Sequence, residues 1–231
     1  MTETLTMFQQ RTAFVRDSLP RDGGFATNPR LTDKVDQDGR FRPFFGDTVI
    51  FDLTEDEKAW LAGIRQGLCE ACGALLAEPL DPASFHITLH DLNSAADPQV
   101  IAPAMALAEE RSRLLLASLP GGWAAHVRPT AVFSMVGTSV VLGFEPVDEE
   151  NCAALMGLYE AFQQVVPLGY ALTPHVTLAY YRPTEGGEDA LRRLRAAIAA
   201  ANQGMAGRTI ALRDPRYCTF TDMNHYHFHG L

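Results

Sequence analysis

The chain carries one short strand pattern twice, and this repeat limits the folds open to it. "SFHITLH" spans residues 84–90 and "TPHVTLAYY" spans residues 173–181, so that His-x-Thr-Leu occurs once in each half. Alternate side chains of a β-strand point to opposite faces. In each copy, His and Thr therefore share one face and the flanking apolar residues share the other. Each copy predicts a strand whose apolar face enters a core and whose polar pair faces a cavity or solvent.

Strand and helix signals alternate around both copies. A strand pattern at 48–53 precedes a capping box of Thr54 and Glu57, after which apolar residues follow at helical spacing. Further helices are expected at about 97–116, 148–166 and 188–202, a hairpin around Gly137-Thr138, and closing strands around 208–213 and 216–229. The order β-α-β-α-β-β-α-β-α-β-β favours an α+β fold with two sheet lobes and helices on their outer faces.

The first 47 residues differ in character from the remainder. A short helix is expected at 5–19, and the stretch 21–47 is rich in Gly, Pro, Asp and Arg, which is typical of an extended arm with turns. We therefore divide the chain into this arm (1–47) and a single bilobal domain (48–231). Within the arm, "DKVDQDG" is close to a calcium-loop pattern, but Lys34 and Phe45 stand where that loop needs carboxylates, so the pattern is rejected.

Charge and hydropathy exclude several classes of protein. The net charge of −9 disfavours a protein that coats long nucleic acid, because such binding uses a basic surface to neutralise phosphates. No apolar run approaches the roughly 18 residues of a membrane span, and the first residues lack the pattern of a secretory signal. We expect a cytoplasmic protein without disulfides, in which Cys69 and Cys72, within a helical pattern, are packed free thiols.

Two His/Thr pairs that face each other across a cleft would supply a base, an acid and two hydroxyl donors. A neutral histidine accepts the proton of the nucleophile, and a protonated one gives a proton to the leaving oxygen. Histidine has an unperturbed pKa of about 6.5, which allows both forms near neutral pH. Threonine hydroxyls would hold the non-bridging oxygens as charge develops. This equipment is sufficient to cleave a phosphodiester without a metal.

The paired "HITL" and "HVTL" resemble the signature of the 2H phosphoesterase superfamily, which includes 2′-5′ RNA ligase-like proteins and cyclic nucleotide phosphodiesterases. The similarity covers most of the chain from about Thr48, and "KVDQDGRFRPFFGDTVIF" resembles a less characterised bacterial and fungal branch. The resemblance implies two lobes related by a pseudo-twofold axis, with the motif strands facing across a central groove. It also implies metal-free hydrolysis or transfer at 2′,3′-cyclic or 2′-5′-linked phosphates. His86, Thr88, His175 and Thr177 match the catalytic motif position by position.

Three other residues are candidates for substrate binding. His90 and Tyr181 lie on the same strand faces as the motif pairs if both strands stay regular. Tyr181 would then stack on a base or, alternatively, pack on a neighbouring element. Arg182 follows the second motif strand directly and is a candidate for phosphate contact, whereas Arg192, Arg193 and Arg195 are typical of a solvated helix face.

Two alternatives to a metal-free enzyme stay open at this point. The first is a non-catalytic module that binds a nucleotide or RNA end in the same groove. The second is a metalloenzyme that uses His225, His227 and His229, which alternate along the last strand. The leading prediction needs neither metal nor cofactor, and its only partner is a small phosphodiester substrate, a nucleotide or short oligonucleotide. The sequence does not indicate an oligomeric state.

Overall fold

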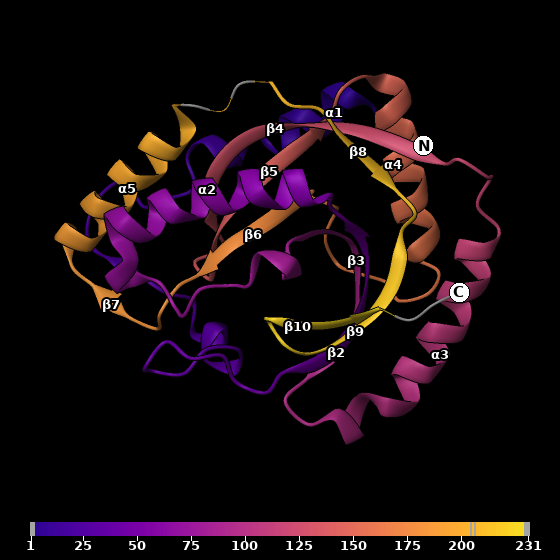
Figure 1. Ribbon diagram of the computed structural model, residues 1–231, viewed down its shortest axis with the longest axis horizontal. Coiled ribbons are helices and arrows are strands. Elements are labelled where there is room, and N and C mark those ends of the chain that lie inside the picture. The colour runs from indigo at the N-terminus through magenta and orange to yellow at the C-terminus, as the bar shows by residue number, and fades with distance from the viewer. Residues whose placement is uncertain (1–2, 204, 206, 229–231) are drawn as a thin grey trace.

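The computed structural model describes residues 3–203, 205 and 207–228, and two four-stranded antiparallel sheets form its centre (Figure 1). One sheet has the order β10-β9-β2-β3 and the other β6-β5-β4-β8. The bounds of these strands are β2 Phe45–Asp52, β3 His86–Ala95, β4 Ala124–Met135, β5 Ser139–Pro146, β6 His175–Tyr180, β8 Ile210–Arg213, β9 Arg216–Asp222 and β10 His225–Phe228. With helices interspersed between the strands, the α+β class predicted from the sequence is confirmed.

The two sheets are built in the same way. In each, an inner strand is followed by a helix and then by an edge strand that carries His-x-Thr. The first unit is β2, α2 (Glu55–Cys72) and β3, and the second is β5, α4 (Glu149–Phe162) and β6. The repeat in the sequence is therefore a repeat of structure, and both motifs lie on sheet edges.

Helices cover the sheets on their outer sides. α3 (Pro98–Ala117) packs against β2 and β3, whereas α2 and α5 (Glu188–Asn202) lie side by side and pack against strands of the second sheet (Figure 1). The expected caps explain where the helices begin. Thr54 and Glu57 form a reciprocal capping box at α2, and the side chains of Asp97 and Asp148 accept backbone N–H groups at the starts of α3 and α4.

Two turns differ from the sequence prediction. The last expected strand, 216–229, is a hairpin of β9 and β10, because Asp222 accepts the N–H of Asn224 and turns the chain there. The loop between β4 and β5 spans residues 136–138, so it contains the expected Gly137-Thr138 and begins one residue earlier, at Val136. Val136 and Gly137 have positive φ, 43° and 70°, as the central residues of a type I′ turn do.

The arm is part of the core. It contains α1 (Leu5–Arg11), the 3₁₀ helices η1 (Ala13–Arg16) and η2 (Pro29–Asp33), and strand β1 (Phe25–Ala26), which pairs with β7 (Glu185–Gly186). Two further 3₁₀ helices, η3 (Gly73–Leu75) and η4 (Pro82–Ser84), lie between α2 and β3. The buried side chains of the arm belong to the same apolar cluster as those of both sheets; they are Phe8, Phe25, Leu31 and Val35.

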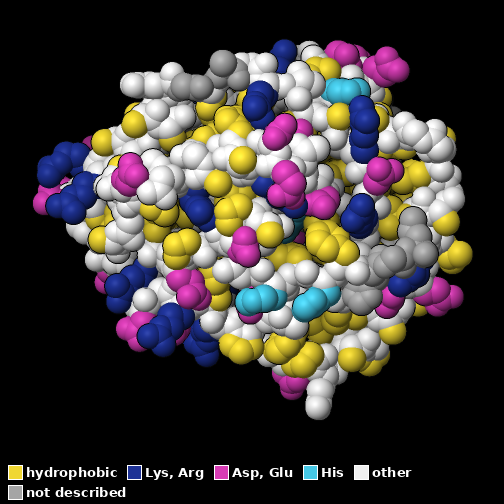
Figure 2. All heavy atoms as spheres, viewed as in Figure 1, with side chains coloured by type: hydrophobic (Ala, Val, Ile, Leu, Met, Phe, Trp, Pro, Cys, Tyr) yellow, Lys and Arg dark blue, Asp and Glu magenta, His cyan; other side chains and the backbone are white. Residues whose placement is uncertain are grey.

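The surface shown in Figure 2 carries acidic and basic side chains interspersed, without a continuous basic area on that face. Within the described part of the chain, no helix is both long and apolar enough to cross a membrane. All four cysteines are free, as predicted, and three of them are buried.

Candidate functional site

A cavity of about 620 Å³ lies between the two motif strands. All four motif side chains, His86, Thr88, His175 and Thr177, line it and are half-buried. β3 and β6 contact each other, so the two edge strands bring together residues from opposite halves of the sequence. A volume of this size is typical of a small-molecule site.

The two histidine rings are held by equivalent hydrogen bonds. Nδ1 of His86 lies 2.7 Å from the carbonyl oxygen of Ser84, and Nδ1 of His175 lies 2.7 Å from that of Thr173. A carbonyl only accepts, so each Nδ1 carries a proton and donates it. In the neutral form, the lone pair of each ring is therefore on Nε2, the nitrogen that remains free for proton transfer.

Both imidazoles are kept neutral by their surroundings. Burial lowers the pKa of His86 to about 4; the hydrogen bond to Ser84 opposes this shift, and a positive charge on His175 adds to it. Burial likewise lowers the pKa of His175, and the charge of Lys34 adds to that shift. The carboxylate of Asp91 acts in the opposite direction on both rings. The two histidines thus share part of their electrostatic environment.

Both motif strands contain a bulge at the leucine that follows the motif threonine. Thr88 pairs with Ile50 and His90 with Val49, so Leu89 has no partner in β2. In β6, the pairing shifts in the same way around Leu178. An extra residue reverses the alternation of side chains beyond it. The regular alternation expected from the sequence therefore ends at the bulge in each strand.

The bulges bring Asp91 and Tyr180 to the cavity, two residues that the sequence reasoning missed. They occupy equivalent positions, each three residues after a motif threonine, and both line the cavity. Asp91 accepts a 2.6 Å hydrogen bond from the hydroxyl of Tyr170. A bulge leaves no simple signal in the sequence. Because it occurs at the same place in both strands, the structural repeat extends beyond His-x-Thr-Leu to Asp91 and Tyr180.

The three predicted substrate-binding residues have different locations. His90 contributes to the cavity lining, but it is only 1% exposed, and its ring lies 5.1 Å from that of Tyr159. Tyr181 does not line the cavity; it is fully buried with its ring centroid 4.7 Å from that of Phe25. Arg182 does not line the cavity either.

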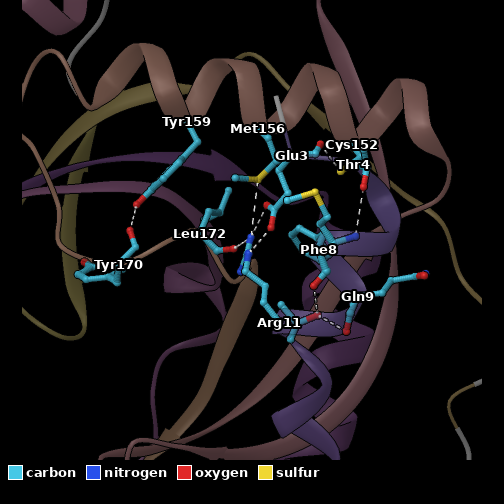
Figure 3. A network of polar contacts seen from close by, with 12 residues as sticks. Glu3, Thr4, Phe8, Gln9, Arg11, Cys152, Met156, Tyr159, Tyr170 and Leu172 are labelled. Atoms are coloured by element: carbon cyan, nitrogen blue, oxygen red, sulfur yellow. Dashed lines mark hydrogen bonds and ion pairs between the residues drawn. The ribbon is translucent and has the colours of Figure 1, made fainter. Parts of the chain in front are cut away.

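Elements outside the motif strands complete the walls. The ring of Tyr226, on β10, lies 4.5 Å from that of His86. Arg11 reaches the cavity from α1, where it pairs with Glu3 at 2.6 Å and donates to the carbonyl oxygen of Leu172 at 2.7 Å (Figure 3). The arm thus contributes Arg11 to the cavity wall, and Figure 3 shows the contacts that hold this side chain.

Of the C-terminal histidines, His225 and His227 lie on β10 and do not line the cavity. Nδ1 of His225 is 2.8 Å from the carboxylate of Asp222, His227 is exposed, and His229 lies outside the described residues. Among the described residues, no group of three or more His, Cys, Asp or Glu side chains is arranged to hold a metal ion.

No protein-family model and no curated protein matches the sequence. Among solved structures, the conserved protein of unknown function ATU0111 from Agrobacterium tumefaciens is 21% identical over 93% of both chains, with a TM-score of 0.70. At this identity the likeness shows a shared fold. TT0787 of Thermus thermophilus is 17% identical over 80% of this chain and 94% of its own, with a TM-score of 0.47. LigT of Escherichia coli is 11% identical over 81% and 95%, with a TM-score of 0.41.

Proposed function

We propose that the protein is a metal-independent phosphodiesterase of the 2H type. Its substrate would be a nucleotide or short oligonucleotide with a 2′,3′-cyclic or 2′-5′-linked phosphodiester, which it hydrolyses or reversibly transfers. The observation that carries this proposal is the pair of equivalent Nδ1 hydrogen bonds in one cavity, because they leave both Nε2 atoms of His86 and His175 free for proton transfer.

In this mechanism, Nε2 of one neutral histidine takes the proton of the attacking water or hydroxyl. The other histidine, protonated, gives a proton to the departing oxygen on the opposite side of phosphorus. Thr88 and Thr177 would donate hydrogen bonds to the non-bridging oxygens. The two histidines exchange roles when the reaction runs in reverse.

Substrate binding would raise the pKa of one histidine, which would then take up from the solvent the proton that the acid needs. The pKa values of both rings are lowered in the unliganded site, mainly by burial. The negative charge of a bound phosphodiester, together with that of Asp91, favours the protonated form of a neighbouring imidazole. One histidine therefore becomes charged when the phosphate enters.

The experiment is a turnover assay on a panel of 2′,3′-cyclic nucleotides, 2′-5′ dinucleotides and ADP-ribose cyclic phosphate, with and without EDTA. His86→Gln and His175→Gln should each lower kcat by about 10²–10⁴-fold because each removes one proton transfer. His225→Gln is the matched control; it lies outside the cavity and should keep full activity. Nucleotide binding without any turnover would indicate a binding module instead, and loss of activity on chelation would contradict the metal-free mechanism.

A further inference from the structure

Two cationic side chains of the arm line the cavity, and they differ in their partners. The guanidinium of Arg11 is neutralised by Glu3 and is also bound to a backbone carbonyl. Lys34 forms no ion pair with any residue that the structure describes. Lys34 is therefore a positive charge available to a ligand in the cavity.

The backbone of Lys34 is fixed by a short loop, residues 34–42, which we call the arm turn. The carbonyl of Lys34 accepts the N–H of Arg42 at 2.9 Å, and its own N–H donates to the carbonyl of Leu31 at 2.9 Å. Nε of Arg182 donates to the carbonyl of Gln37 at 2.9 Å and so anchors the arm turn to the end of β6. Arg182 thus contacts the arm turn and not the cavity.

The ammonium of Lys34 lies on the wall of the cavity that the motif residues also line. Its Nζ is 5.1 Å from the ring centroid of Phe44 and 5.8 Å from that of Tyr180. Tyr180 is three residues beyond Thr177, which at about 3.3 Å per residue corresponds to roughly 10 Å along the strand. Lys34 and His175 line the same cavity, and the charge of Lys34 contributes to the lowered pKa of His175, after burial as the main cause.

We propose that Lys34 binds a second phosphate group of the substrate, adjacent to the phosphodiester that is cleaved. This inference rests on the proposed function. It narrows the substrate class to nucleotides that carry a phosphate group in addition to the phosphodiester that is cleaved. A lysine ammonium is a usual partner of phosphate. The ring contacts of Lys34 are with Phe44 and with Tyr180, which is three residues beyond Thr177, so Lys34 would bind a phosphate other than the one that the motif threonines hold.

The test compares two unreactive ligands, adenosine 3′-monophosphate and adenosine 3′,5′-bisphosphate, by calorimetry. The unmodified protein should bind the bisphosphate about 10-fold or more tightly than the monophosphate, as expected of a charge-assisted contact. Lys34→Met should abolish this preference. Arg30→Met removes a cation of the same arm that does not line the cavity, and it should keep the preference. Circular dichroism of each variant checks that it is folded.

Equal affinity of the unmodified protein for both ligands would overturn the inference. An equal loss of affinity for both ligands in Lys34→Met would also overturn it, because Lys34 would then bind the 3′-phosphate that the two ligands share. Turnover assays distinguish a wrong role for Lys34 from a wrong proposed function. If 2′,3′-cyclic AMP is cleaved but an added 5′-phosphate does not change kcat/KM, only the role of Lys34 is wrong. If neither nucleotide binds and no cyclic nucleotide is cleaved, both proposals fail.

Discussion

The imidazoles of His86 and His175 are fixed in the same tautomer but have different neighbours. The ring of Tyr226 covers one side of His86, whereas the ammonium of Lys34 acts on His175. The carbonyls that fix the rings belong to Ser84 and Thr173, two residues before each histidine. Such a local bond holds the ring without a carboxylate partner, so it leaves the imidazole less basic than an Asp-His pair would.

The shifted pKa of His86 predicts a pH dependence of stability. In the folded protein this pKa is about 4, below the value of about 6.5 expected in an unfolded chain. The unfolded chain therefore binds more protons between these values, so stability is complete above about pH 6.5 and falls as the pH decreases toward 4. Between about pH 7 and pH 5, His86 should account for a loss of about 2 kcal/mol.

Urea unfolding at these two pH values measures this loss. His86→Asn removes the titrating group, so the variant should lose less of its unfolding free energy on acidification than the unmodified protein does. The remaining loss belongs to other groups, including His90 and His175, whose pKa values are also lowered by burial. Equal losses in the two proteins would contradict the assignment of the shift to His86.

At the residue scale, the sequence predicted the motif pairs but only part of their surroundings. His86, Thr88, His175 and Thr177 could be found because a repeated pattern of alternate polar and apolar residues has a direct structural meaning. Tyr180 could not, since counting regular alternation from Thr177 leads to the neighbouring Tyr181. The bulge at Leu178 shifts the alternation of side chains by one residue. It arises from the pairing of β6 with β5, a tertiary contact that the residues of β6 alone do not indicate.

At the scale of elements, helices were more predictable than strand ends. The caps of α2, α3 and α4 are local, and their sequence signals appear at the observed positions. The division of the last strand into β9 and β10 depends on the side chain of Asp222, and the pairing of β1 with β7 joins the arm to the second half. These features depend on tertiary contacts that no short window of sequence contains.

Gly46 in β2 is an element-scale test of how tightly the first sheet is packed. A Cβ there would overlap the carbonyl oxygen of Asn93 and the ring of Phe220, neither of which moves freely in a paired strand. Gly46→Ala should lower the free energy of unfolding by about 1–3 kcal/mol. Chemical denaturation with an unchanged m-value would measure it.

The matched control is Gly63→Ala in α2. Apart from its chain neighbours and the backbone of its own helix, no atom of the described residues lies within 4 Å of a Cβ at this exposed position. Alanine should therefore raise the free energy of unfolding by about 0.5–1 kcal/mol through helix propensity alone. If Gly46→Ala were stabilising as well, a Cβ at this position would fit without displacing Asn93 or Phe220, and the assignment of tight packing to β2 would be wrong.

At the scale of the whole molecule, both sheets and the arm share one apolar cluster. Trp123, which directly precedes β4 of the second sheet, stacks on Phe51 of β2 in the first, with an interplanar angle of 8° and 5.7 Å between centroids. The two lobes are thus joined by packed side chains as well as by the cavity. A cavity between lobes keeps its geometry only if the lobes do not move apart, so this contact also supports the site.

The shared core predicts that the protein unfolds in one transition. In a Trp60→Phe variant, Trp123 is the remaining tryptophan, and its fluorescence reports the contact between the sheets, whereas far-UV circular dichroism reports the helices and strands. The two denaturation curves should coincide. Adding Phe51→Leu should shift both midpoints to lower denaturant together, because the lost contact belongs to a single cooperative unit. If fluorescence changed at lower denaturant than circular dichroism, the lobes would separate before they unfold, and each would have to be stable alone.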